Sequence, residues 1–213
     1  MIDEREKPLS EIRVDRIASQ VLHLAEGEDL RVPLDVSAGG SFLIRATLAE
    51  RSSLTILALG EVRGEISIVR MIDEAGAGSS IRFLSAIRVC EGAKVTLDSD
   101  IRVSSSDVRC EIDDRLVAED GSRSIVRHRV VVEKDVARSA VSTAIRGMIS
   151  GEEGSIRAIP ELDIRSNTVQ AKHAVSITRP QKETLAYFAT RGIPRKEAMT
   201  LLAEQLLCPI SRL

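Results

Sequence analysis

His173 is the residue of this sequence whose type and setting best suit metal or proton chemistry. It lies in a strand-like run, 168–178, in which alternation places Ala171, His173 and Val175 on one face. A neutral imidazole binds iron and zinc, and it carries protons near neutral pH. Three further potential ligands lie nearby in the sequence: Asp163, Glu161 and Asn167. A histidine that only fills a core or interface position is the alternative interpretation, because the sequence does not show whether these groups converge.

The other histidines and the three cysteines lack partners at ligand spacing. His23 and His128 are interpreted as surface residues, with His128 facing solvent between neighbouring apolar positions. Cys90 and Cys110, twenty residues apart in strand-like sequence, are typical of small core hydrophobes, with a thiolate site as the alternative. Nothing near Cys208 would activate its thiol. An odd number of widely spaced cysteines supports neither a zinc ribbon nor a disulfide framework.

The motifs of common nucleotide-binding and hydrolytic enzymes are absent from the sequence. Residues 60–64 have two glycines but lack the Gly-Lys-Ser/Thr ending of a Walker A loop, so we expect no bound nucleotide. Neither Gly-x-Ser-x-Gly nor His-Glu-x-x-His occurs. A net charge of -2 and an aromatic content of 2% give no reason to expect nucleic acid or a membrane surface as a partner. With no apolar leader at the N-terminus and no long apolar run, we expect a cytoplasmic protein.

Short strand-like runs separated by polar turns fill most of the chain. Their first apolar residues lie at 54, 66, 81, 95, 108, 125, 140 and 156, and no helical pattern interrupts them between Leu30 and Thr178. Residues 15–24 fit a strand or a short helix, and the alternation of Leu22 and Leu24 favours a strand.

A right-handed parallel β-helix (β-solenoid) is the predicted fold for residues 13–178. A similar Glu-containing turn recurs before strands, hairpin dipeptides are scarce, and the small aliphatic core residues can stack from coil to coil. A β-sandwich is the alternative. Residues 1–12 are predicted to form a flexible arm, and residues 179–213 a helical segment.

The C-terminal segment has the spacing of two helices. Thr178 and Gln181 resemble a capping box around Pro180, residues 191–194 form a turn, and Cys208 before Pro209 is predicted to end the second helix. Each predicted helix has one apolar face: Leu185, Phe188 and Ala189 in the first, and Ala198, Leu201, Leu202 and Leu206 in the second. The pair is too small to fold alone, so it must dock on the β body, on a partner, or on both.

A DNA-binding helix-turn-helix does not fit this hairpin. The second helix contains two glutamates and neither Arg nor Lys between 197 and 207, and its surface is largely apolar. Such a hairpin is better suited to a protein groove.

The C-terminal sequence resembles the SufB/SufD family of iron–sulfur cluster assembly scaffolds. The resemblance rests on Thr-Val-Gln-Ala-Lys-His-Ala at 168–174, followed at 183–198 by a helix with an aromatic pair, an Arg-Gly-Ile turn and a second helix. The Pro-Glu-Leu-Asp-Ile run at 160–164 is similar to the preceding strand of the family. The specific similarity covers about 40 residues.

The resemblance implies a β-helix that pairs near its C-terminal end, as a homodimer or a SufB–SufD-type heterodimer. It also implies that the C-terminal helices bind SufC, an ABC-type ATPase. His173 matches the histidine associated with assembly of a transient iron–sulfur cluster. The implied partner-binding residues are Leu185, Tyr187, Phe188, Arg191, Gly192, Ile193, Ala198 and Leu202.

Four departures from the SufB pattern make the chain resemble a short, SufD-like member. Ile164 stands where SufB has a cysteine used in cluster building, and Lys172 and Ala174 replace the acidic residues that flank the histidine. Ala186 replaces the first aromatic residue of the helix. A partner subunit would therefore supply the missing ligands.

Two functions from different classes follow from the sequence. The first is a non-enzymatic assembly scaffold whose partner ATPase supplies the catalysis. The alternative is a β-solenoid or β-sandwich hydrolase or lyase that acts on a saccharide or small molecule with a pair of carboxylates.

Overall fold

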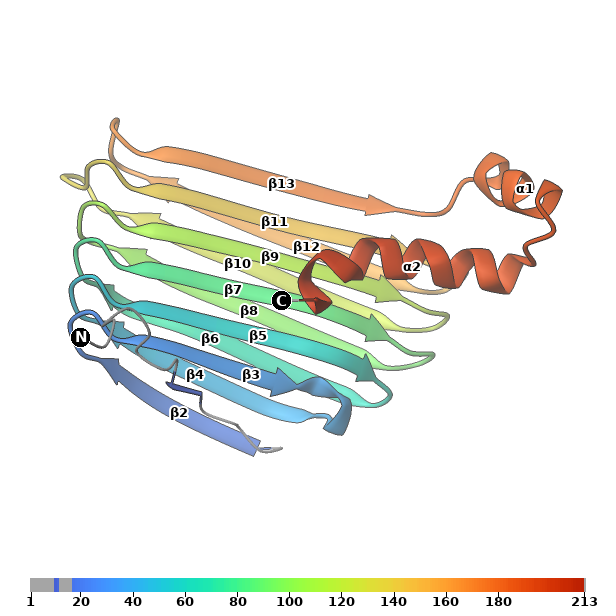
Figure 1. The fold of residues 1–213 in the computed structure, drawn as a ribbon, viewed down its shortest axis with the longest axis horizontal. Coiled ribbons are helices and arrows are strands. Elements are labelled where there is room, and N and C mark those ends of the chain that lie inside the picture. Colours follow the sequence, from blue (N-terminus) through green and yellow to red (C-terminus); the bar gives the residue numbers. More distant parts are fainter. Residues whose placement is uncertain (1–9, 12–16, 213) are drawn as a thin grey trace, which may run out of the picture.

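The chain folds into a parallel β-solenoid of about five coils with two C-terminal α-helices (Figure 1). The computed structural model describes residues 10–11 and 17–212, with side chains from Ser19 onward. Odd-numbered strands form a seven-stranded sheet: β1 Ser10–Glu11, β3 Asp29–Asp35, β5 Ser53–Val62, β7 Ser80–Val89, β9 Arg109–Ala118, β11 Ala140–Ile149 and β13 Gln170–Thr178. Even-numbered strands form a six-stranded sheet: β2 Ile17–Leu24, β4 Gly40–Leu48, β6 Glu65–Ala75, β8 Lys94–Val103, β10 Arg123–Val132 and β12 Ser155–Ile164.

The solenoid prediction is confirmed, and the sandwich alternative is wrong. Successive strands alternate between the two sheets, and the strand pairs within each sheet are parallel, whereas a sandwich is built from antiparallel sheets. The run at 15–24 contains a strand, β2, as its alternation indicates. A 3-10 turn at Val36–Ala38 is the one helical interruption among the described residues of 30–178.

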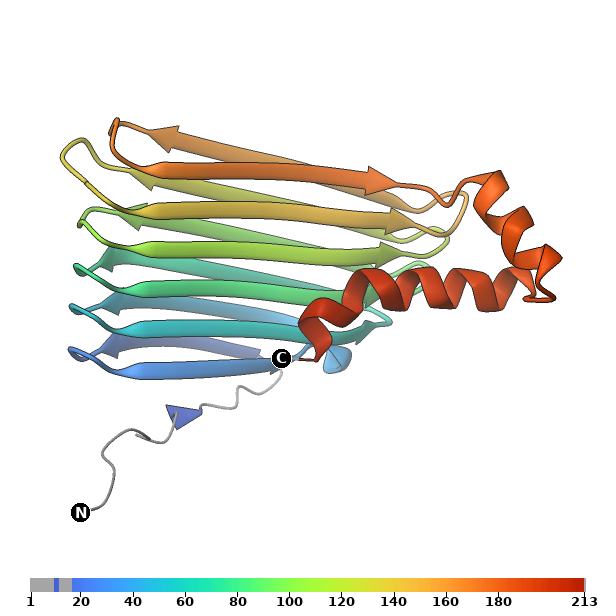
Figure 2. The same ribbon diagram turned by 45° about the horizontal axis from the view of Figure 1, so that its top comes forward.

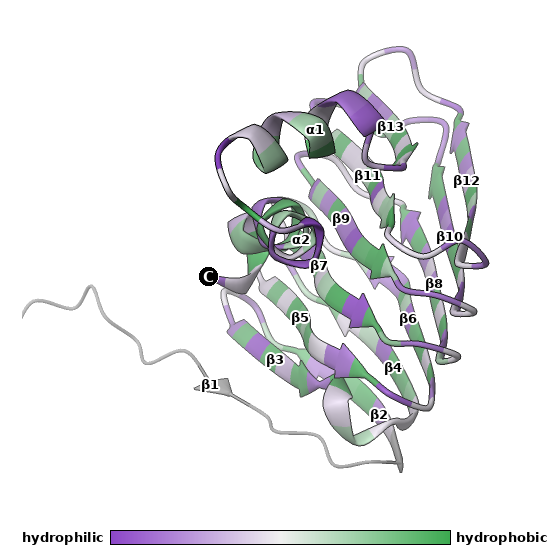
Figure 3. Ribbon diagram, turned by 90° about the vertical axis from the view of Figure 1, so that its right-hand side faces the viewer, coloured by the Kyte–Doolittle hydropathy of each residue, from purple (hydrophilic) through white to green (hydrophobic). Residues whose placement is uncertain are grey.

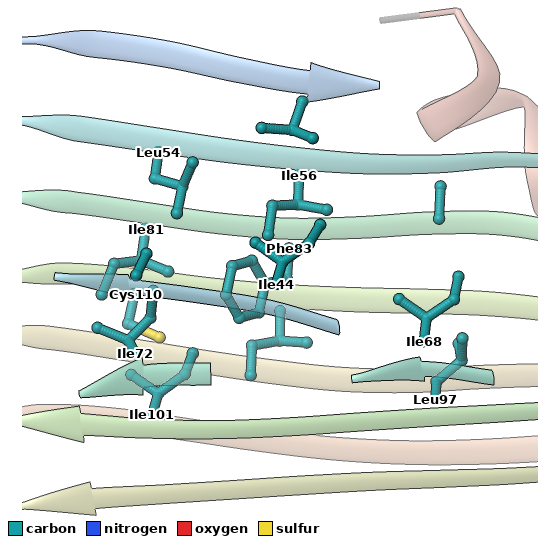
Figure 4. Packing of buried hydrophobic residues seen from close by; sticks show 14 of the residues in the cluster. Ile44, Leu54, Ile56, Ile68, Ile72, Ile81, Phe83, Leu97, Ile101 and Cys110 are labelled. Carbon is teal, nitrogen blue, oxygen red and sulfur yellow. The ribbon is translucent and has the colours of Figure 1, made fainter. Parts of the chain in front are cut away.

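The core is a stack of aliphatic ladders between the two sheets. Because parallel strands in register place equivalent side chains on the same side, Val32, Ile56, Phe83 and Ile112 follow one another from coil to coil. All four are at least 99% buried. Figure 4 shows this packing around Ile56 and Phe83, with Ile44, Ile68 and Leu97 from the facing sheet.

One corner of the solenoid repeats the same turn in successive coils. A residue with positive φ occurs there in each coil: Gly27, Arg51, Gly78, Asp107 and Arg138. The backbone N–H of each donates to a carbonyl of the next coil, as from Arg51 to Ala77 and from Asp107 to Ala137. These turn bonds continue the ladder hydrogen bonds of the sheets around the corner, so the coils remain in register.

Helices α1 (Lys182–Thr190) and α2 (Arg195–Ser211) follow β13, and α2 lies on the outer face of the seven-stranded sheet (Figures 2 and 3). Four residues of α2 pack near Val117 and Met148 of the sheet: Leu202, Ala203, Leu206 and Leu207. Ile210 packs with Leu57, Leu84 and Ala86. No helix among the described residues is long and apolar enough to cross a membrane.

The predicted capping box is wrong. Thr178 still belongs to β13, where it pairs with Met148, so it is unavailable as a helix cap. Gln181 is the N-cap residue of α1, and its side chain makes no capping hydrogen bond.

The predicted end of α2 before Pro209 is also wrong, because the helix continues to Ser211. Proline lacks the N–H that would reach the carbonyl of residue 205. Beyond the proline, burial of Ile210 holds the chain on the sheet, and Arg115 donates to the carbonyl of Leu206 at 3.1 Å. Tertiary packing therefore outweighs the local preference of the Cys208–Pro209 pair.

Candidate functional site

The C-terminal end of the solenoid leaves the inner face of β13 exposed and that of β12 half-buried. We call this surface the open end, and it consists of inward-facing residues of β12 and β13: Ile156, Ala158, Pro160, Leu162, Ile164, Ala171, His173, Val175 and Ile177. Every residue of β13 is exposed, including Val175 at 42% and Ile177 at 36%. The open end is thus an apolar core layer that no further described coil covers.

His173 is the titratable side chain of the open end. It pairs in register with Thr143 of β11, which follows Ile112 and Phe83 along the same inward ladder. An interior position in any earlier coil would be buried, so the exposure of His173 results from its place in the last coil.

The acidic residues near His173 in sequence do not converge on it. Asp163 alternates with the inward-facing Leu162 and Ile164 of β12, so it lies on the outer face. It accepts a hydrogen bond from Arg165 at 2.6 Å, and Glu161 lies 3.9 Å from Arg129. Asn167 lies in the turn between the two strands. The group formed by His173, Asp163, Glu161 and Asn167 that the sequence suggested is therefore not assembled within one chain.

The cysteines are free thiols, and two of them are buried, as expected of small core hydrophobes. Burial raises the pKa of Cys110 to about 12, so its thiol stays protonated at neutral pH. Burial, together with nearby Glu119, raises the pKa of Cys90 as well. Neither residue has the low pKa of a reactive thiolate.

The accessible apolar side chains of α1 and its turn form a second candidate surface. We call it the hairpin surface, and it consists of Leu185, Tyr187, Phe188 and Ile193. Tyr187 is 59% exposed, and α1 has no buried residue. Phe188 meets the Tyr187 ring edge-on, and the Arg191 guanidinium lies 5.6 Å from that ring, so the three side chains form one projecting unit with the Gly192 turn behind it.

Two of the residues implied to bind a partner are buried or half-buried within this chain. Ala198 is fully buried, and Leu202 packs near Val117 and Met148. Leu202 therefore helps to hold α2 on the sheet, and Ala198 offers no exposed surface to a partner. Arg179 fixes the approach to α1, because its guanidinium donates to carbonyls of the β11–β12 turn, including that of Glu152 at 3.1 Å.

Comparison with known proteins gives the family. Residues 43–206 match the family model described as the SufBD core domain of SUF-system FeS cluster assembly. The chain belongs to the SufBD family. The match extends from the second coil through His173 to α2, so it includes both the open end and the hairpin surface.

A curated SufBD relative is a longer protein than this chain. An "Iron-sulfur cluster assembly SufBD family protein" of Archaeoglobus fulgidus is 28% identical over 120 residues. The aligned region is 56% of this chain and 32% of that protein. The aligned part of the chain thus spans about a third of the length of this relative.

The sequence interpretation missed a buried ionic cluster inside the SufBD solenoid. Arg70 and Asp114 are both fully buried, and the Arg70 guanidinium donates to both carboxylate oxygens, at 3.1 and 2.7 Å. His128 Nε2 lies 2.8 Å from Asp114 Oδ2, so the prediction that His128 faces solvent is wrong. The signal was present, because His128 has the same alternation as the buried Val126 and Val130.

Carboxylates on the outer face of β8 pair with arginines of β10. Asp98 pairs with Arg127 at 3.2 Å, and Asp100 pairs with Arg129 at 3.1 Å in the next coil. In the part of the chain that the structure describes, no three His, Cys, Asp or Glu side chains gather as a metal site. A cluster held by several thiolates does not fit these residues alone, since Ile164 packs against the core and the thiols of Cys90 and Cys110 are buried.

Proposed function

We propose that this chain is a SufD-like scaffold component of iron–sulfur cluster assembly. The family match carries the proposal, because it extends through His173 and the helices. The cluster is the cargo of the scaffold, held transiently with a partner subunit. An SufC-type ABC ATPase, docked on the hairpin surface, supplies the catalysis.

Dimerisation through the open end is the first part of the proposal. β12 and β13 each pair with one described neighbour, so each presents an unpaired backbone edge beside exposed apolar side chains. A second β-solenoid placed on this end would cover Val175 and Ile177 and would bring its own residues to His173. A SufB-like partner is favoured over a second copy, because Ile164 cannot provide a thiolate.

Docking of the ATPase on the hairpin surface is the second part. Tyr187, Phe188 and Arg191 belong to residue types that dominate the energetics of protein interfaces. In this chain they lie on α1 and its C-cap, where no residue of α1 is buried, while α2 is anchored to the sheet. Helix α2, which is held on the sheet, thus supports the aromatic side chains of α1.

Replacing Tyr187 with alanine is expected to weaken binding of a SufC-type ATPase by at least about thirtyfold, because truncating a central interface aromatic costs about 2 kcal/mol or more. The measurement is a pull-down followed by calorimetric titration with the purified ATPase. Val21→Ala is the matched control, since Val21 is 62% exposed but lies on β2 in the first coil. ATPase binding that is equal for wild type and both variants would reject the docking site.

Replacing His173 with alanine is expected to lower cluster formation in a reconstituted complex while leaving the fold intact, because the side chain is exposed. Cluster content is measured by iron analysis and visible absorbance. Lys172→Ala is the control, because Lys172 lies next to His173 and faces the opposite side of β13. A His173→Ala complex with wild-type cluster content would make the histidine a structural residue.

A further inference from the structure

The buried ionic cluster contains polar atoms that no described residue satisfies. Arg70, Ser99 and His128 lie in register on β6, β8 and β10, and all three are at least 99% buried. Arg70 Nε, Ser99 Oγ and His128 Nδ1 have no hydrogen-bond partner among the described residues. Most buried polar side-chain atoms in folded proteins are paired with protein groups or with ordered water, so three such atoms on neighbouring strands require a partner.

Arg70, His128 and Asp114 mark the corners of a triangle, and Ser99 lies on the side between Arg70 and His128. Arg70 Nη2 and His128 Nε2 reach the same oxygen, Asp114 Oδ2, at 2.7 and 2.8 Å. The strands that carry Arg70 and His128 are two strand spacings apart, or about 10 Å. The side chains of Arg70 and His128 therefore converge on Asp114, which lies on the opposite sheet. Ser99 lies on the strand between Arg70 and His128, and its side chain is smaller than theirs.

Protonation at Asp114 decides which hydrogen bonds remain available. Burial alone would raise the pKa of Asp114, but the charge of Arg70 and the hydrogen bond to His128 hold that pKa well below its usual value. Asp114 is therefore a carboxylate, and His128 Nε2–H must donate to it. In the neutral imidazole, Nδ1 is then an acceptor. With a neutral imidazole, the unsatisfied set consists of one N–H donor, one ring-nitrogen acceptor and one hydroxyl that can donate or accept.

We propose that an ordered water molecule binds in this triangle and bridges Arg70 Nε, Ser99 Oγ and His128 Nδ1. The water accepts from Arg70, donates to His128 and shares its third hydrogen bond with Ser99. Three hydrogen bonds to buried polar groups are the usual number for an internal water. The ligand is a neutral molecule with two donors and two acceptors, so it satisfies all three atoms without adding charge to the core. With the Ser85 hydroxyl, 3.2 Å from Arg70 Nη1, the hydrated cluster joins the two sheets.

Ser99→Ala tests the water site by the sign of its effect on stability. If the water is bound, the variant removes one of its three partners, and the melting temperature of the full chain falls by about 2–4 °C. If the triangle is dry, the same change removes an unsatisfied buried hydroxyl, so the melting temperature stays the same or rises. Either of these latter results overturns the proposal.

Ser124→Ala is the matched control. Ser124 is a buried serine of the same sheet whose Oγ also lacks a described partner, but its register neighbours are Val95 and Ile156 instead of charged groups. Its melting temperature is expected not to fall. An equal fall for both variants would show a general cost of Ser→Ala at buried strand positions and would reject the site.

A high-resolution crystal structure of the wild-type chain gives an independent result if Ser99→Ala does not fold. Density for a water within hydrogen-bonding distance of Arg70 Nε and Ser99 Oγ is expected. A triangle without such density, in crystals that show other buried waters, overturns the proposal.

Discussion

Asp114→Ala is expected to lower the free energy of unfolding by about 3–5 kcal/mol, because it leaves the Arg70 guanidinium unpaired in the core. The wild-type pair is fully buried, and the carboxylate also accepts from His128, so one substitution removes the partner of two buried groups. The result is measured by urea denaturation. A melting temperature lower by about 10 °C is the corresponding thermal effect.

Two comparison variants separate the cost of leaving a buried charge unpaired from the general cost of losing a carboxylate. Asp100→Ala removes an exposed pair with Arg129 on the outer face and is expected to cost less than about 1 kcal/mol. The double variant Arg70→Met, Asp114→Leu removes both charges together and is expected to recover most of the stability. A cost for Asp114→Ala no larger than that of Asp100→Ala would contradict the expectation.

The difference in stability between wild type and Asp114→Ala depends on pH, because the pKa of Asp114 is lowered in the folded protein. Because the pKa of this carboxyl is lower in the folded protein than in the unfolded chain, its contribution to stability is fully present above the unfolded value near 3.9. The contribution is lost as the pH falls towards the folded pKa. The stability difference between wild type and Asp114→Ala should therefore narrow below about pH 4.

The spacing of polar turns was enough to predict the strands of the solenoid. The predicted first apolar residues at 66, 81, 95 and 156 lie one residue inside β6, β7, β8 and β12. Short strands of alternating residues can pair in several ways, but turns of few residues and stackable aliphatic side chains favour coils. The fold class was thus available from local sequence.

The partners of the buried polar residues could not be predicted without the arrangement of the two sheets. His128, Asp114 and Arg70 have the alternation of buried residues on their own strands, and each has a charged or polar type that usually indicates the surface. Only the pairing of Asp114 with a residue 44 positions earlier explains why Arg70 is tolerated in the core. A sequence read one strand at a time does not contain that pairing.

The same limit applied to the functional surfaces. The sequence placed His173 on one face with Ala171 and Val175, which is correct, but it did not show that this face is the uncovered last layer of the core. Ala198 and Leu202 matched the helical pattern of a docking surface, yet Ala198 is buried within the chain and Leu202 packs against the sheet beneath α2. An apolar helical face is expected to be covered by other residues, but the sequence does not show whether these belong to the same chain or to a partner.

Val175→Asp is expected to abolish dimerisation through the open end. Val175 lies between His173 and Ile177 on the inner face of β13, where a partner would bury it. A carboxylate sealed there without a counter-ion costs several kcal/mol, so the dissociation constant should rise at least about a hundredfold. Sedimentation or light scattering over a concentration series, for the chain with itself and with a SufB-like partner, measures the effect.

Ser176→Asp is the control that makes this result specific to the inner face. It introduces the same charge on the neighbouring residue of β13, which is also exposed but points to the outer face of the sheet. Because both sites are exposed in the single chain, neither variant should lower the melting temperature of the monomer by more than about 2 °C. Dimerisation that survives Val175→Asp, or that fails equally in Ser176→Asp, would place the interface elsewhere. Loss in Val175→Asp alone would show that the last core layer of the solenoid is completed by its partner.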